Sequence, residues 1–193
     1  MSEAVLKRVA ERFPEAIVQG YSYLGDETLV VKREHLVEVA RFCHDDPSVD
    51  LKLPLSVTCV DYLGQERPRF ELVYTLYSIA HKHRLRLKVQ LEEANPVAPS
   101  VTPVWAGMDY WERYCWDMYG IQFTGRTTEL KRLWMYEEFV GHPLRKDYPL
   151  RGRQPRIPQR DFQDIYRGPG PGPGSEPAAH APATRPGSLP VLK

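Results

Sequence analysis

The pattern of apolar and polar residues predicts two amphipathic helices in the first quarter of the chain. Apolar residues recur three and four positions apart over residues 2–13, and Pro14 ends this pattern. The same period returns over residues 34–44 and stops before Pro47. The apolar face of this second helix is predicted to bury Leu36, Val37, Ala40 and Cys43. Each helix therefore has one face to pack against another layer.

Five strands are predicted around and after these helices. The first two flank Gly25 and Asp26, residue types that favour a tight turn, and so predict a hairpin. The expected strands cover residues 16–23, 28–32, 55–63, 70–78 and 85–91. His81 and His83 fall in the turn before the last strand, and we expect them on the surface rather than in a metal site, because no third ligand is near.

The last strand has the clearest alternation of all. Its apolar residues are Leu85, Leu87, Val89 and Leu91, and the residues between them are Arg84, Arg86, Lys88 and Gln90. One face is therefore apolar and the other is a cationic stripe. Such a stripe is typical of a solvated sheet face or of edge protection, and a surface that docks a partner is the alternative.

A tryptophan-rich helix is predicted next, with Thr102 as its N-cap, Pro103 at its first position and Gly120 at its end. Its apolar seam, expected to pack on the sheet, consists of Val104, Met108, Trp111, Cys115 and Met118. Asp109 and Arg113 have the spacing of an ion pair. Residues off the seam are candidates for a second, exposed contact surface, because aromatic rings beside charges often mark interfaces. They are Trp105, Glu112, Trp116, Asp117 and Tyr119.

The order α-β-β-α-β-β-β-α predicts an α+β two-layer domain, with a mixed or antiparallel sheet, over residues 1–123. Gly125, Gly141 and Pro143 interrupt any helical period after it, so residues 124–167 are predicted to form an extended docking arm. Residues 168–193 are dominated by Pro, Gly, Ala and Ser and are predicted to be a disordered tail.

Composition narrows the function. The 193 residues carry a net charge of only +1, so whole-protein attraction to nucleic acid or anionic lipid is not expected. No secretory signal and no membrane-spanning apolar run is expected. The 3 cysteines form no C-x-x-C pair, which fits a reducing cytosol and argues against a local iron–sulfur or zinc motif.

Two function classes have weak support. The catalytic and phosphate-binding signatures that begin with glycine-rich loops or H-E-x-x-H are absent from the sequence. Candidate acids or bases are Glu112, Asp117, His142 and Asp147, but no spacing pairs them. A basic arm could neutralise phosphates, which makes nucleic-acid binding a distant alternative. Its basic residues are Arg145, Lys146, Arg151, Arg153, Arg156, Arg160 and Arg167.

A more specific pattern begins inside the tryptophan helix. It consists of ERYCWDMYGIQFTG from Glu112, LKRL from Leu130 and GHPLRKDYPL from Gly141. This pattern strongly resembles the signature of the C subunit, or thirty-kilodalton subunit, of proton-pumping NADH:quinone oxidoreductase, respiratory complex I. The resemblance extends to about residue 150. The chain departs from the family signature at Tyr114 and in the Gly125–Thr128 segment.

The resemblance implies a structural subunit of the peripheral arm with no catalytic, cofactor-binding or metal-binding residues of its own. It would bind the large D subunit of the forty-nine-kilodalton type, with the B subunit and other peripheral-arm subunits nearby. FMN, iron–sulfur clusters and quinone would lie on those neighbours. The chain would be a peripheral protein on the cytoplasmic side of the bacterial inner membrane, with membrane contact only through the complex.

The expected partner interface combines the off-seam residues of the helix with the arm. It comprises Trp105, Glu112, Arg113, Trp116, Asp117, Tyr119, His142, Arg145, Lys146, Asp147, Tyr148, Arg151 and Arg153. The alternative to complex I is a homologous subunit of a related membrane-bound hydrogenase, or of a quinone oxidoreductase with another electron donor. Fold and motif do not separate these, because the electron-input module lies on other chains.

Overall fold

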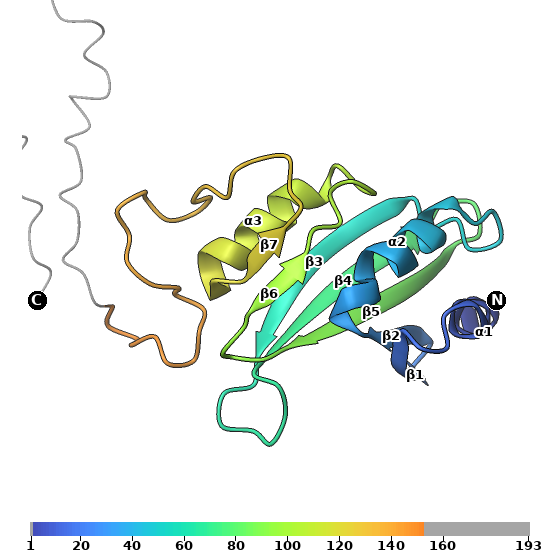
Figure 1. Cartoon of the computed structure of the whole chain (residues 1–193), viewed down its shortest axis with the longest axis horizontal. Helices are drawn as coiled ribbons and strands as arrows, with labels where there is room; N and C mark the ends of the chain where they lie inside the picture. Colours follow the sequence, from blue (N-terminus) through green and yellow to red (C-terminus); the bar gives the residue numbers. More distant parts are fainter. Residues whose placement is uncertain (1, 153–193) are drawn as a thin grey trace, which may run out of the picture. The chain divides into compact units, whose positions relative to one another are not determined.

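A five-stranded mixed sheet lies at the centre of the computed structural model, which describes residues 2–152 (Figure 1). The strand order is β1-β2-β5-β4-β3. The strands are β1 (Ile17–Tyr23), β2 (Asp26–Val31), β3 (Leu53–Asp61), β4 (Phe70–Ser78) and β5 (His83–Leu91). All neighbours are antiparallel except β2 and β5, whose parallel pairing joins the two halves of the sheet. The sheet is therefore mixed, which is one of the two forms that the sequence predicts.

The helices form a second layer on one face of the sheet. They are α1 (Ser2–Arg12), the 3-10 turn η1 (Arg33–His35), α2 (Leu36–Asp45) and α3 (Met108–Tyr119). Apolar side chains from all three α-helices join those of the strands in one buried core. Figure 1 shows α3 beside β3, where the sulfur of Cys115 lies 3.6 Å from the carbonyl oxygen of Val57. The predicted two-layer α+β architecture is confirmed.

The cationic stripe lies on the opposite face of the sheet. On β5, Leu85, Leu87 and Val89 are buried, and the alternate residues face outward as predicted. Because β5 lies between β2 and β4, edge protection is the wrong explanation for the stripe. Arg86 binds Asp26 at 2.6 Å and Lys88 binds Glu71 at 2.8 Å. Neighbouring strands thus neutralise part of the stripe.

Several local predictions need correction. The second helix opens with a 3-10 turn and buries Val39 instead of Val37. His83 begins β5 and is only 6% exposed, so it is not a surface turn residue. The tryptophan helix begins at Met108 rather than Thr102, because residues 102–107 form turns.

The helix ends where the sequence predicts, at Gly120, whose φ of 75° lies in the left-handed region that favours glycine. The short strand β6 (Val97–Pro99), which precedes α3, pairs in parallel with β7 (Gln122–Thr124), which follows it. This small second sheet fixes the chain on both sides of α3. No helix within residues 2–152 is long and apolar enough to cross a membrane.

The structure describes only some of the residues for which the sequence predicts domain boundaries. The described residues 2–152 lie within one compact unit, which continues across the boundary drawn at residue 123. The rest of the predicted arm and the predicted disordered tail at 168–193 lie outside the described residues.

Removing a core side chain from the central strand should test this arrangement. Leu87 is 1% exposed, so Leu87→Ala should lower the free energy of unfolding by about 2–5 kcal/mol, through lost burial and the cavity left behind. Urea unfolding of the full chain, followed by circular dichroism, measures the change. Arg84→Ala, on the outer face of the same strand, is the matched control and should change it by less than about 0.5 kcal/mol. Equal losses in both variants would contradict the assigned faces of β5.

Candidate partner interface

The segment after β7 folds back along α3 without forming a helix or strand. We call residues 125–152 the strap. It contacts one side of α3 through Asp109, Arg113 and Asp117, which lie four positions apart and therefore share a helix face. The predicted Asp109–Arg113 ion pair is wrong. Asp109 binds Arg126 and Thr128, and Arg113 donates to strap carbonyl oxygens.

Asp117 is the first of three buried carboxylates that hold the strap. Its Oδ2 atom accepts the backbone N–H groups of Leu133, Trp134 and Met135 at 3.0, 2.8 and 3.1 Å. Its Oδ1 atom lies 2.7 Å from the guanidinium of Arg132. Burial acts to raise the pKa of Asp117, but the charge of Arg132 and the three N–H donors outweigh it and hold the pKa below its usual value. The strap backbone is thereby fixed at the C-terminal half of α3.

Arg132 extends this attachment along the strap. Its guanidinium also donates to the carbonyl oxygens of Phe139 at 2.6 Å and Gly141 at 3.1 Å. It lies 5.5 Å from the ring centres of both Trp116 and Phe139, within cation–π distance. One arginine therefore joins the helix to two separate parts of the strap.

Glu112 is the second buried carboxylate, with no exposed surface. It accepts hydrogen bonds from Ser100 Oγ and the Val101 N–H, both at 2.8 Å, and binds Arg126 at 2.6 Å. Burial raises the pKa of Glu112 despite these partners. Arg126 lies in the Gly125–Thr128 segment that departs from the family signature, so this segment attaches the start of the strap.

Asp61, at the end of β3, is the third buried carboxylate. It binds the guanidinium of Arg69 at 3.1 Å and accepts the backbone N–H of Lys146 at 2.9 Å. The same guanidinium reaches Asp147 at 2.9 Å. Burial acts to raise the pKa of Asp61, but Arg69 and the Lys146 N–H lower it overall. The far end of the strap is thus fixed to the sheet.

The strap also covers the C-terminus of α3. His142 Nδ1 lies 3.0 Å from the carbonyl oxygen of Asp117, and Arg145 Nε donates to that of Tyr119. Burial lowers the pKa of His142. A Cβ atom on Gly120 would lie 2.5 Å from side-chain nitrogens of both His142 and Arg145. The glycine therefore ends the helix and also leaves room for the strap.

The predicted interface residues divide into three groups. Trp105, Glu112 and Asp117 are buried, and the expectation that they form an exposed surface is wrong. Glu112 and Asp117 bind the strap, and Trp105, which precedes α3, donates its indole N–H to the carbonyl oxygen of Leu51 at 3.1 Å. The half-buried group comprises Arg113, Trp116, Tyr119, His142, Arg145 and Tyr148. Lys146, Asp147 and Arg151 are exposed, and Arg153 lies outside the described residues.

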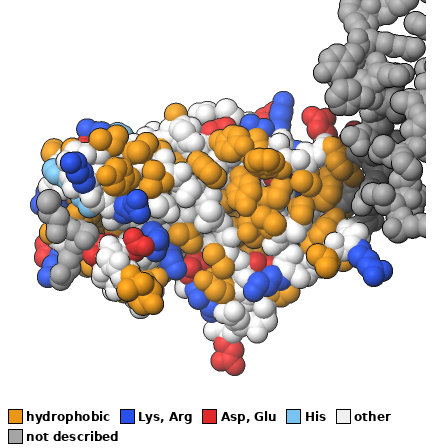
Figure 2. Space-filling model, turned by 180° about the vertical axis from the view of Figure 1, so that it is seen from behind, with side chains coloured by type: hydrophobic (Ala, Val, Ile, Leu, Met, Phe, Trp, Pro, Cys, Tyr) orange, Lys and Arg blue, Asp and Glu red, His pale blue; other side chains and the backbone are white. Residues whose placement is uncertain are grey.

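Exposed apolar side chains on the strap were not predicted. Trp134 is 63% exposed, and Val140, Leu144 and Leu150 are also exposed. Figure 2 shows hydrophobic side chains gathered on the half of the molecule that holds α3 and the strap. The signal in the sequence is a set of large apolar residues between glycines and prolines with no helical or strand period. Exposed apolar side chains that gather into one contiguous patch are typical of a protein-binding surface.

The acids considered for catalysis have structural partners. Glu112, Asp117 and Asp147 each bind an arginine of this chain. Among the described residues, no group of three or more His, Cys, Asp or Glu side chains could hold a metal ion. The charges of these three acids are therefore paired with arginines within the chain.

Comparison with known proteins points to one family. Residues 29–154 match the family model of the respiratory-chain NADH dehydrogenase 30 Kd subunit. The C subunit of the NADH-quinone oxidoreductase of Roseiflexus castenholzii is 47% identical over 146 residues, which cover 76% of this chain and 83% of the relative. That of Geobacter sulfurreducens is 42% identical over 151 residues, which cover 78% and 91% of the two chains.

Two solved structures have the same fold. A trypsin-resistant fragment (1-134) of Nqo5 superposes with a TM-score of 0.54 at 26% identity, covering 66% of this chain and 98% of the fragment. A chain of the membrane-bound sulfane sulfur reductase, an archaeal respiratory membrane complex, gives a TM-score of 0.64 at 21% identity. That match covers 77% of this chain and 85% of the other, and at this identity it shows the fold alone.

Loss of the Asp117 carboxylate should release the strap. Asp117→Ala leaves three N–H donors without their acceptor and removes the carboxylate that pairs with Arg132, which should lower the free energy of local opening by about 3–5 kcal/mol. Hydrogen exchange of the amides of residues 133–135 should then accelerate by a hundredfold or more, on the order expected for that loss. Glu129→Ala is the control, because Glu129 is 85% exposed. Unchanged exchange in the Asp117 variant would contradict the attachment.

Acid should release the same segment. The pKa values of Asp117 and Asp61 are lowered by folding, so their stabilisation is full above the unfolded-state pKa of about 3.9 and is lost as the pH falls through the folded-state pKa. Folding raises the pKa of Glu112, so the contribution of Glu112 to stability is lost as the pH rises and not as it falls. Glu112 therefore cannot cause this loss in acid. NMR amide shifts of residues 133–135 should move toward unfolded values below about pH 4. Asp117→Asn should abolish this pH-dependent change in the amide shifts. A change that persists in that variant would contradict its assignment to the titration of Asp117.

Proposed function

Because the chain belongs to the family of the 30 Kd subunit of respiratory-chain NADH dehydrogenase, we propose that it is a non-catalytic subunit of the peripheral arm of NADH:quinone oxidoreductase. The strap is its docking surface for the D subunit, of the forty-nine-kilodalton type. Through this contact the chain supports the module that reduces quinone. That reaction is coupled to proton translocation elsewhere in the complex.

The attachment of the strap by three buried carboxylates is the observation that carries this proposal. Asp61, Glu112 and Asp117 fix the backbone of a segment that has no helix or strand of its own. Its exposed side chains, such as Trp134, are therefore held in place before a partner arrives. Preorganisation of this kind lowers the entropy cost of binding, and exposed aromatic residues are frequent centres of binding energy.

FMN, iron–sulfur clusters and quinone belong to neighbouring subunits in this proposal. The cysteines support that division of labour. Cys43, Cys59 and Cys115 are buried, and burial raises the pKa of the first two thiols to about 12 and that of Cys115 as well. A protonated thiol is a poor metal ligand, because thiolates bind iron and zinc.

The proposed position is on the cytoplasmic side of the bacterial inner membrane, with the B subunit near the D subunit. The exposed surface of the strap supports attachment through protein contacts. In this position the chain would sediment with membranes only while the complex is intact.

A related complex with another electron donor is the second candidate. The same fold is present in a chain of the sulfane sulfur reductase, an archaeal respiratory complex named for a different reaction, so the fold by itself does not separate the two candidates. The higher identity to C subunits of NADH-quinone oxidoreductases, 47% and 42%, favours the first candidate. Genes for NADH-binding and FMN-binding subunits beside the gene of this chain would decide between them.

Deletion of residues 147–193 should release the chain from its complex and leave the domain folded. The deletion removes Asp147, Tyr148 and the exposed end of the strap, while the sheet and the three α-helices remain. Affinity purification through a tag on this chain, with identification of the co-purifying subunits, measures the loss. Circular dichroism of the truncated chain checks that it is folded.

A shorter truncation, after Gly152, is the control because it keeps every contact described for the strap. Normal co-purification of the D subunit with the 147–193 deletion would contradict the docking role of this part of the strap. Co-purification of hydrogenase or reductase subunits in place of NADH-binding and FMN-binding subunits would favour the second candidate.

A further inference from the structure

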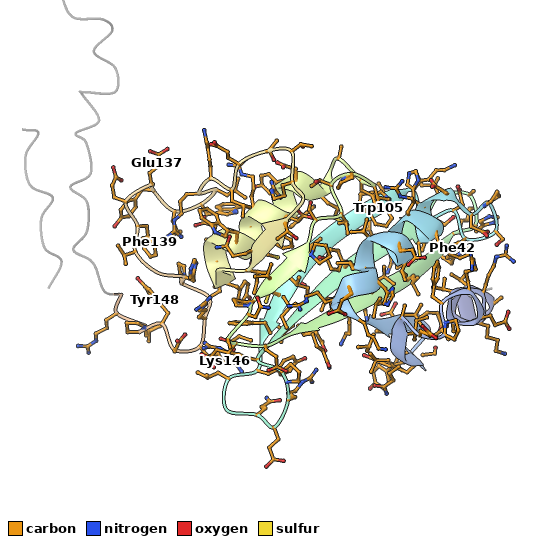
Figure 3. The ribbon with its side chains drawn as sticks, viewed as in Figure 1. Phe42, Trp105, Glu137, Phe139, Lys146 and Tyr148 are labelled. Carbon is orange, nitrogen blue, oxygen red and sulfur yellow. The ribbon has the colours of Figure 1, made fainter. Side chains whose placement is uncertain are left out.

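A cavity opens on the strap away from α3. Its volume is about 550 Å³, within the range of about 300–1,000 Å³ typical of ligand pockets. Its apolar lining comes from Met135, Phe139, Pro143, Tyr148, Pro149 and Leu150. The rings of Phe139 and Tyr148 stack with centres 6.0 Å apart, and Figure 3 shows both on the outer loop of the strap. The cavity can therefore receive at least one large apolar side chain.

Basic residues complete the lining. They are Arg145, Lys146 and Arg151. The nearest acid in sequence, Asp147, binds Arg69 instead. Among the described residues, no carboxylate forms a salt bridge with Arg145, Lys146 or Arg151. Burial and the positive charge of Arg69 lower the pKa of Arg145, while the nearby carboxylates of Asp147, Asp61 and Glu93 act to raise it. The lining thus combines apolar walls with three cationic side chains and no carboxylate, although carboxylates that pair with Arg69 lie behind it.

We infer that this cavity binds an extended segment of the partner in which a large apolar side chain lies next to carboxylates. The inference rests on the proposed docking role of the strap and specifies the chemistry of what docks there. Aromatic and aliphatic walls select the apolar side chain, and the basic lining selects its acidic neighbours.

The C-terminal part of this chain is the competing occupant, and its charge argues against it. Residues 153–167 include Arg153, Arg156, Arg160 and Arg167 against Asp161 and Asp164. This excess of basic residues would add positive charge to a cavity whose lining already carries three cationic side chains. An acidic segment neutralises the cavity instead.

Reversing the charge of two basic residues in the cavity lining tests whether the cavity selects an acidic segment. Lys146→Glu with Arg151→Glu, in the full chain, should weaken binding of the purified D subunit on the order of tenfold at low salt. The difference from the unaltered chain should shrink as salt is raised, because exposed charges are screened. Arg41→Glu with Arg84→Glu is the matched control, since it reverses two exposed cations outside the strap and should leave the affinity unchanged. An equal effect in the control would overturn the inference.

A photo-crosslinking residue at position 150 tests the identity of the occupant. Leu150 is fully exposed at the cavity, so the substitution does not disturb the core. The expected product is a crosslink to a segment of another subunit that contains an apolar residue flanked by Asp or Glu. A crosslink to residues 153–193, to a second copy of this chain or to a neutral or basic segment would overturn the inference, as would no crosslink in the purified complex.

The two tests separate this inference from the proposed function. If the charge-reversed chain binds the D subunit normally but the 147–193 deletion does not, the docking role stands and the acidic occupant is wrong. If the unaltered chain does not bind the D subunit, the proposed function itself fails.

Discussion

Three buried carboxylates determine how the second half of this chain is arranged. Asp61, Glu112 and Asp117 lie against the sheet or on α3, and each accepts N–H groups or binds arginines that other segments supply. A buried charge without its partner costs several kcal/mol, whereas a paired and hydrogen-bonded one is tolerated. The strap is therefore part of the folded unit, although it has no regular secondary structure. Its irregular path follows the positions of these acids.

The architecture follows from local patterns in the sequence. Period-two alternation predicts strand 70–78 with the bounds that β4 has in the structure. Helical periodicity likewise identifies the core face of α3. The parallel pairing of β2 with β5 could not be predicted, because it joins segments separated by a helix and two strands. Periodicity defines which face of a strand is buried but carries no information about its neighbours.

The candidate interface was less predictable because burial there depends on distant segments. Asp109 and Arg113 have the spacing of a surface ion pair, and the same spacing serves a helix face that binds a neighbouring segment. Asp117 resembled an exposed charge beside aromatic rings, and only the path of residues 132–135 encloses it. Trp134 lies in a segment without helical or strand periodicity, so periodicity could not assign its side chain to a buried or an exposed face. The pattern of aromatic rings beside charges assigned Trp105, Glu112 and Asp117 to an exposed surface, and the structure buries all three.

The order in which the chain is synthesised gives the strap a further consequence. The three acids leave the ribosome before the strap residues that bind them, because Arg126, Arg132 and Lys146 all come later in the sequence. The nascent domain therefore carries acids without their full set of partners until translation has passed residue 146. A partner that recognises the ordered strap can bind only a chain that has been made to this point.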